Sequence, residues 1–135
     1  MFTVTTEQSF DSAHFLSGYN GKCKNIHGHR WTIIVEVGKG QLDSSSMVVD
    51  FTHLKKDLKE MADYLDHSLI IETGTLKPVT YQALQEEDFR IIEVPFRPTA
   101  ECFAKYFFDC MTEKGYSVIR TKVYETPNNC ATYEV

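Results

Sequence analysis

Residues 27–38 read HGHRWTIIVEVG and alternate between two kinds of side chain. Successive side chains of an extended strand point to opposite faces, so every second residue from position 27 shares one face. That face carries His27, His29, Trp31, Ile33, Val35 and Val37, and the other carries Arg30, Thr32, Ile34 and Glu36. The stretch therefore predicts a β-strand whose apolar face ends in two histidines.

Three further strands are predicted around this one. Residues 2–13 are rich in Phe, Val, Thr and Ser with a short alternation, and a loop over 15–26 joins them to the strand already described. Near the C-terminus, residues 119–125 alternate in the same way. Residues 131–135 can pair with them behind a turn at 127–129, which reads Pro-Asn-Asn.

Two helices are predicted between these pairs of strands. Over residues 51–65, apolar side chains recur at steps of three and four, which places them on one stripe of a helix with Asp50 or Thr52 as its N-cap. The stripe consists of Phe51, Leu54, Leu58, Met61 and Leu65. A second helix begins after Thr99, which caps it, and Gly115 ends it.

The segment between the helices is predicted to be mostly loop. Residues 71–90 are polar and contain Gly74 and Pro78, and only residues 91–94 favour a short strand. The order strand, strand, helix, helix, strand, strand indicates a single α+β domain over residues 1–135, with two helices on one face of an antiparallel sheet. The long edges of such a sheet favour pairing with another subunit.

Composition excludes several classes of protein. Hydrophobic residues make up 42% and charged residues 24% of the 135, as in a globular domain rather than a disordered or collagen-like chain. The net charge of −5 argues against a general nucleic-acid or anionic-membrane binder. No apolar run approaches the roughly 20 residues that cross a bilayer, and the N-terminal residues do not form a secretory signal. We therefore expect a cytoplasmic protein whose four cysteines are reduced.

Three histidines form a candidate metal site. His27 and His29 are two residues apart on a strand, so their imidazoles point the same way. Pairing of the first two strands brings His14, at the end of the first, beside them. Three neutral imidazoles suit zinc and leave one coordination position open for chemistry. The alternative is a pair of histidines on a half-buried strand with no ligand.

Four other residues each allow two interpretations. Cys23 lies four residues before His27. It is either a fourth zinc ligand, which would make the site structural, or a catalytic thiolate. Cationic neighbours favour the thiolate over the thiol. Asp66 and His67 are either an ordinary helix C-terminus or an acid–base pair. Glu125, at the end of an apolar strand face, is either solvated at the sheet margin or an anchor that makes a two-point contact with a planar N–C–N group.

Six segments, taken in order, resemble the family of 6-pyruvoyltetrahydropterin synthases and 6-carboxytetrahydropterin synthases, which have the tunnelling fold. The segments are FDSAHFL (10–16), CKNIHGHRW (23–31), MVVDF (47–51), LDHSLI (65–70), RPTAE (97–101) and VYETPNNCATY (123–133). The three residues between Cys23 and His27 resemble the 6-carboxytetrahydropterin synthase branch, which makes the queuosine precursor in bacteria. The segment 71–94 is longer than in compact members, and Ser12, Arg97 and Cys102 depart from the residues common at their positions.

The resemblance implies a role for each candidate residue. It implies that His14, His27 and His29 bind zinc and that Cys23 is the general base. It also implies that Asp66 and His67 form the partner acid–base pair and that Glu125 anchors the aminopyrimidine edge of a pterin. It further implies a ββααββ subunit in a homohexamer of two trimers, with active sites between subunits. Candidate cations for the substrate's phosphates are Lys22, Lys24, Arg30 and Arg97.

The implied reaction converts 7,8-dihydroneopterin triphosphate into 6-carboxy-5,6,7,8-tetrahydropterin, acetaldehyde and triphosphate. Two alternatives stand beside it. One is a 6-pyruvoyltetrahydropterin synthase, which eliminates triphosphate but keeps all side-chain carbons. The other is a non-enzymatic protein in which Cys23 and the three histidines form a closed structural zinc site.

Overall fold

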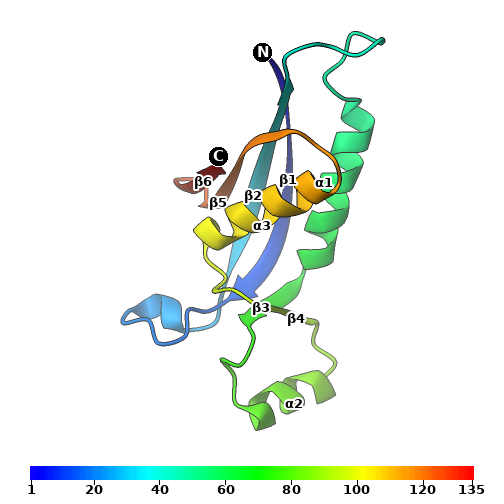
Figure 1. Cartoon of the computed structure of the whole chain (residues 1–135). Helices are drawn as coiled ribbons and strands as arrows, with labels where there is room; N and C mark the ends of the chain where they lie inside the picture. Colours follow the sequence, from blue (N-terminus) through cyan, green and yellow to red (C-terminus); the bar gives the residue numbers. More distant parts are fainter.

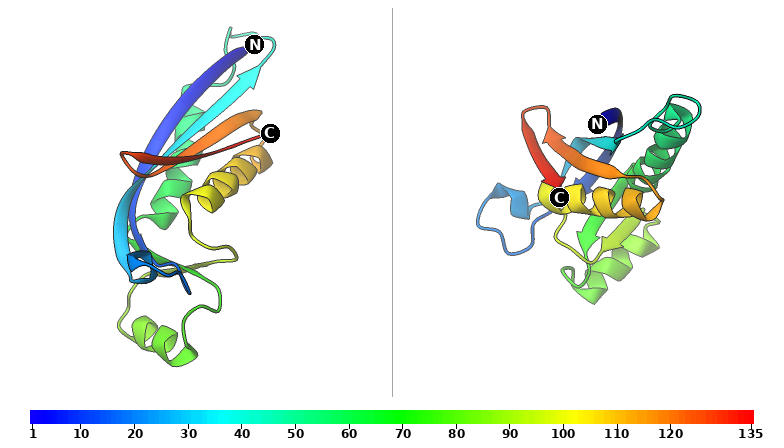
Figure 2. Two further views of the ribbon diagram at one scale, coloured as in Figure 1. Left: turned by 90° about the vertical axis from the view of Figure 1, so that its left-hand side faces the viewer. Right: turned by 45° about the horizontal axis from the view of Figure 1, so that its top comes forward.

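Two long strands run through the computed structural model, which describes residues 1–135 (Figure 1). β1 (Phe2–His14) pairs antiparallel with β2 (His27–Lys39) over their full length, from Phe2 opposite Lys39 to His14 opposite His27. β5 (Val118–Thr126) and β6 (Asn129–Glu134) continue the sheet antiparallel beyond β2. These four strands confirm the strand pairs that the alternation predicts. The sheet is strongly curved, so that β5 and β6 cross over the long strands (Figure 2).

Two helices cover one face of this sheet, as the sequence predicts (Figure 1). α1 (Phe51–Leu65) begins at Asp50, whose side chain accepts a hydrogen bond from the Thr52 backbone nitrogen, so that Asp50 is its N-cap. α3 (Ala100–Glu113) begins at Thr99, whose hydroxyl accepts from the Cys102 nitrogen. No helix of the protein has the length and apolarity that crossing a bilayer requires.

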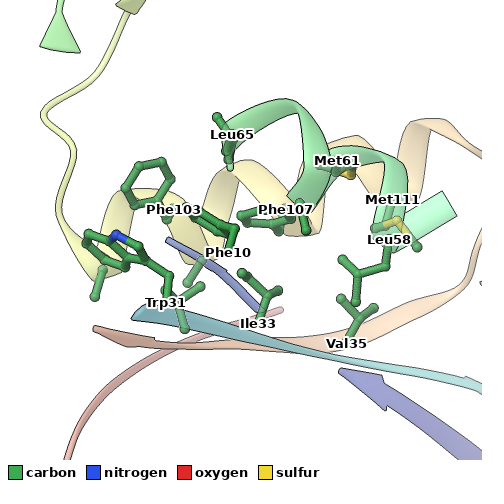
Figure 3. Close-up of a cluster of buried hydrophobic side chains, with 14 of the residues drawn as sticks. Phe10, Trp31, Ile33, Val35, Leu58, Met61, Leu65, Phe103, Phe107 and Met111 are labelled. Atoms are coloured by element: carbon green, nitrogen blue, oxygen red, sulfur yellow. The ribbon is translucent and has the colours of Figure 1, made fainter. Parts of the chain in front are cut away.

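The core lies between these helices and the alternating inner face of β1 and β2 (Figure 3). Its fully buried large side chains include Phe10, Trp31, Ile33, Leu58, Phe103, Phe107 and Met111. The stripe of α1 is buried as predicted from Leu54 onward, but its first member, Phe51, is 55% exposed. Phe51 lies in the first turn of the helix and is not part of the buried core cluster.

The segment after α1 differs from the prediction. The short strand predicted over residues 91–94 is found as β4 (Ile91–Val94), but β3 (Ser68–Glu72) was not predicted. The two strands are parallel to each other and lie beside β1, which gives the order β4-β3-β1-β2-β5-β6 and makes the sheet mixed. Between them α2 (Pro78–Glu86) occupies residues predicted to be loop, and it projects from one end of the molecule (Figure 1). α2 buries none of its residues, so it lacks the apolar stripe by which a helix is recognised.

Phe103 links the core to the end of the sheet that carries the histidines. Its side chain is 0% exposed, and its ring packs edge-on against Trp31 with centroids 5.0 Å apart. We expect Phe103→Ala to lower the free energy of unfolding by about 3–5 kcal/mol, because the substitution leaves a cavity. The matched control is Lys105→Ala on the exposed side of α3, which should change it by less than about 0.5 kcal/mol. Denaturant unfolding at equal protein concentration measures both, and equal effects of the two variants would contradict the assignment of Phe103 to the core.

Candidate active site

The sheet brings the three predicted histidines together. The register places His14 opposite His27 and Ser12 opposite His29, all on the face that carries the core. The ring centroids lie 4.6 Å (His14–His27), 5.2 Å (His14–His29) and 4.8 Å (His27–His29) apart. One ring nitrogen from each histidine lies within 4.8 Å of the other two. The three rings therefore converge on one point at the end of the buried strand face.

Two backbone carbonyls decide which ring nitrogens are free to bind. His14 Nδ1 lies 2.7 Å from the Pro98 oxygen, and His27 Nδ1 lies 2.7 Å from the Asn25 oxygen. A carbonyl only accepts, so each Nδ1 carries the proton and each neutral ring directs the lone pair of Nε2 outward. Those two Nε2 atoms are 3.1 Å apart. Two lone pairs at that distance repel one another unless a cation or a proton lies between them.

Burial of the histidines disfavours their protonation, so that a metal ion is favoured over a proton between the ring nitrogens. Removal of His14 from water lowers the pKa of its imidazole to about 4, against a weaker opposing effect of the Pro98 carbonyl. Burial also lowers the pKa of His29, although the nearby Glu125 carboxylate acts in the other direction. His14 is thus neutral at pH 7, the form in which an imidazole binds a metal ion.

The third nitrogen has no partner within the chain. His29 Nε2 is buried and makes no hydrogen bond, and although Glu125 Oε1 is 3.4 Å away, the two atoms are not aligned for one. Leaving a buried polar atom unpaired costs about 1–3 kcal/mol, so an external ligand is expected there. The Trp31 ring packs edge-on against His14 and His29 and covers them on the side that faces the core. The three residues fit a metal ion bound through nitrogen, with a coordination position left open.

Glu125 lies beside this cluster. It is near the end of β5, where the pairing with β6 is irregular between Tyr124 and Thr126, and its side chain is 28% exposed. It is not part of the group of converging ligand atoms. Alternation along the strand predicts the face that Glu125 occupies, but its closeness to His29 becomes visible only in the folded sheet.

Cys23 lies in the short 3₁₀ turn Lys22–Lys24 that precedes β2, and its side chain is half-buried. No disulfide joins any of the four cysteines. The Cys23 sulfur does not belong to the converging group of ligand atoms. The chain by itself therefore forms a three-nitrogen group, which favours an open site over the closed structural one.

Asp66 and His67 follow directly after α1 and form a connected pair. Asp66 Oδ2 accepts from His67 Nδ1 at 2.7 Å, and Asp66 Oδ1 accepts from the Asp11 backbone nitrogen at 2.8 Å. The hydrogen bond from Asp11 and then that from His67 lower the pKa of the Asp66 carboxyl. The His67 side chain is 79% exposed, with Nε2 free to meet a substrate. An ionised carboxylate that orients an exposed imidazole is suited to proton transfer.

The pair and the histidine cluster lie on opposite faces of the sheet. Asp11 alternates with the buried residues Phe10 and Ser12 and so points away from the core. The carboxylates of Asp11 and Asp66 and the ring of His67 form a second convergent group on that side. The Asp66–His67 pair and the three histidines therefore do not meet within one chain.

A groove of about 580 Å³ runs beside His67. Arg30 and Arg90 contribute positive charge to it, and Leu84 and Phe89 form an apolar part of its wall. Of these four residues, the sequence singles out only Arg30, which follows the histidine motif directly. The other three belong to the segment predicted to be mostly loop, and their only signal in the sequence is the length of that segment.

Comparisons with known proteins identify the family of the chain. Residues 3–135 match the 6-pyruvoyl tetrahydropterin synthase family, and the chain belongs to that family of enzymes. A protein of Haemophilus influenzae named 6-carboxy-5,6,7,8-tetrahydropterin synthase is 36% identical over 141 residues, covering 99% of both chains. One of Aquifex aeolicus with the same name is 32% identical and covers 84% of this chain and 76% of its own. The resemblance seen in the sequence is thereby confirmed.

Solved structures show the same fold. An uncharacterized protein of Wolinella succinogenes superimposes with a TM-score of 0.84 at 20% identity, over 98% of this chain and 97% of its own. The 6-pyruvoyl tetrahydropterin synthase of Caenorhabditis elegans superimposes with a TM-score of 0.69 at 26% identity, over 100% and 97%. The α+β tunnelling fold expected from the sequence is confirmed.

The histidine cluster generates a test of metal binding. We expect about one divalent metal ion per purified chain, and His27→Ala and His29→Ala should each lose most of it, because two nitrogens hold such an ion poorly. The matched control is His53→Ala, at an exposed position of α1, which should keep the ion. Elemental analysis of the folded variants provides the measurement. Full metal content in both strand variants would remove His27 and His29 as ligands.

Proposed function

We propose that the chain is a zinc-dependent lyase. It converts 7,8-dihydroneopterin triphosphate and water into 6-carboxy-5,6,7,8-tetrahydropterin, acetaldehyde and triphosphate. The observation that carries the proposal is the three-nitrogen group, found in a chain that matches a relative with this synthase name over 99% of both lengths. The four free thiols accord with the reducing cytoplasm, where we place the enzyme.

Zinc is the ion that the donor set favours. Three neutral imidazoles with one open position are typical of catalytic zinc. When bound there, zinc lowers the pKa of a hydroxyl that it contacts and stabilises negative charge on oxygen. The chain's own contribution is to orient His14 and His27 through the Pro98 and Asn25 carbonyls, and to exclude water below them with Trp31.

Three side chains then act on the substrate. Glu125, beside the cluster, accepts two hydrogen bonds from the N–C–N edge of the pterin and so fixes the ring. Cys23, as a thiolate, takes a proton from a side-chain carbon. His67, held by the Asp66 carboxylate, returns or relays a proton through its free Nε2. Elimination of triphosphate and cleavage of the side chain yield the three products.

The two faces of the sheet imply a site shared between chains. The metal cluster lies on the core face and the Asp66–His67 pair on the other, so a second copy must supply one of them. The edge of β1 that faces away from β2 is paired with β3 only at Ser12 and Ala13, and the outer edge of β6 has no strand partner in the chain. Free strand edges of this kind join subunits. We propose a homohexamer of two trimers with active sites between subunits.

Product analysis tests the proposed reaction. Zinc-loaded protein is incubated with 7,8-dihydroneopterin triphosphate, and the products are identified by mass. We expect acetaldehyde and the 6-carboxy product in equal amounts. A pyruvoyl product without acetaldehyde would instead show a 6-pyruvoyltetrahydropterin synthase. Loss of folding on metal removal, without turnover by the loaded protein, would indicate a structural zinc protein.

The shared site predicts complementation between two inactive variants. Cys23→Ala and His67→Ala should each keep the metal and the fold but lose turnover by a hundredfold or more, on the order expected for a missing proton-transfer group. Co-expressed with different tags and purified as mixed oligomers, they should recover activity in about a quarter of the sites, those with Cys23 from one chain and His67 from the other. No recovery in mixed oligomers would mean that both residues act within the same chain. Loss of metal in Cys23→Ala would instead make Cys23 a ligand.

Glu125 generates a test of pterin binding. Glu125→Gln keeps the size of the side chain but turns one acceptor toward the pterin into a donor, which costs on the order of 2–4 kcal/mol. Pterin affinity should fall by roughly thirty- to thousandfold. Metal content in the same preparation should not change, since Glu125 is not a proposed ligand. Unchanged affinity would mean that Glu125 is a solvated residue at the strand end.

A further inference from the structure

Arg90 lies at the end of the long segment between β3 and β4 and contacts the turn that carries the acid–base pair. We propose that Arg90 is a positioning residue that holds the Asp66–His67 peptide in place and so sets the direction of the His67 imidazole. The inference rests on the proposed function for its effect on turnover. Its structural part stands on the contacts of Arg90 alone.

The guanidinium binds the C-terminal end of α1. Arg90 Nη1 donates to the Asp66 carbonyl oxygen at 2.7 Å, and Nη2 donates to the Tyr64 carbonyl oxygen. The guanidinium also lies over the Tyr64 ring, 5.7 Å from its centroid. The last carbonyls of a helix have no partner within it and carry partial negative charge, so a cation with a planar fork of donors is well suited to them. No carboxylate forms an ion pair with Arg90.

One peptide group is held from both sides. The Asp66 carbonyl that accepts from Arg90 belongs to the peptide bond between Asp66 and His67. The N–H of the same peptide bond donates to the Asp11 carbonyl at 2.6 Å. Arg90 and β1 thus fix the plane of this peptide, and with it the backbone angles on either side.

His67 needs such support because its backbone is strained. Its φ angle is +53°, in the left-handed region that residues with a Cβ rarely adopt. A residue stays in this conformation only when its surroundings determine it, and such residues cluster at functional sites. Here the strained backbone directs the imidazole toward Asp66 Oδ2 and leaves Nε2 exposed.

The strands on either side anchor Arg90 itself. Its carbonyl accepts from the Leu69 nitrogen at 2.9 Å, and the parallel pairing of β3 with β4 begins at Leu69 opposite Ile91. The long segment therefore returns the chain to the sheet at a place from which the Arg90 guanidinium reaches the end of α1. The pairing of β3 with β4 thereby has a role at the candidate active site.

Kinetics of Arg90 variants test the positioning role. Arg90→Ala should lower kcat by about ten- to hundredfold, since a small displacement of a catalytic group has effects of that size, with KM changed less than about twofold. Arg90→Lys should lie between this variant and the wild type, because an ammonium lacks the planar fork that reaches both carbonyls. The matched control is Lys59→Ala, on the exposed side of α1, whose C-terminal end Arg90 contacts. This variant should leave kcat unchanged.

The same substitution in a chain that already lacks the His67 imidazole separates a positioning role of Arg90 from a role in the stability of the fold. In a His67→Ala chain, assayed with enzyme in excess, Arg90→Ala should cause no further loss, because Arg90 acts through His67. An equal loss in both backgrounds would show that Arg90 only stabilises the fold and would overturn the proposal. An unchanged kcat in Arg90→Ala would overturn it as well.

Hydrogen exchange tests the contact without reference to activity. Peptides covering residues 64–69 should exchange faster in Arg90→Ala than in the wild type, while peptides from β2 keep their rates. Unchanged exchange at residues 64–69 would show that Arg90 does not hold the turn. If the wild type does not turn over the pterin triphosphate, the proposed function fails, and this measurement still decides whether Arg90 holds the peptide.

Discussion

The antiparallel register of β1 and β2 is the constraint on which the rest of the molecule depends. It sets Phe10 opposite Trp31 and His14 opposite His27, so that the largest core side chains and the converging ring nitrogens share one face. A slip of one residue would turn one strand's whole set of side chains to the opposite face. His14 would then leave the cluster, and Phe10 would leave the core. The packing that stabilises the sheet therefore also fixes the geometry of the candidate metal site.

The histidine cluster is unfavourable to build without a ligand. It buries His14 completely, holds two Nε2 atoms 3.1 Å apart and leaves the buried Nε2 of His29 without a partner. The Asn25 and Pro98 carbonyls, which orient two of the rings, come from the loop before β2 and the segment before α3. A bound metal ion would offset these costs and join both segments to the sheet, so that metal binding and local order are coupled.

The second half of the proposed chemistry lies on the opposite face and depends on different elements. The end of α1 provides Asp66 and His67, β1 provides the backbone of Asp11, and the chain before β4 provides Arg90. Because a single sheet separates this group from the histidines, neither group is a complete site in an isolated chain. Oligomerisation is then a requirement of the proposed mechanism and not only a way to cover free strand edges.

Local signals in the sequence determined most of the framework. The period of two in β1 and β2, the stripe of α1 and the caps Asp50 and Thr99 are properties of neighbouring residues, and they predicted these elements correctly. The spacing of His27 and His29, together with a strand ending at His14, predicted the cluster for the same reason. Only the tertiary structure decided the rest. β3 becomes a strand by pairing in parallel with β1, which is far away in sequence. α2 has no buried apolar stripe from which its helix could be predicted. The approach of Glu125 to His29 and of Arg90 to Asp66 arises from the curvature and strand order of the sheet, which no spacing along the chain encodes.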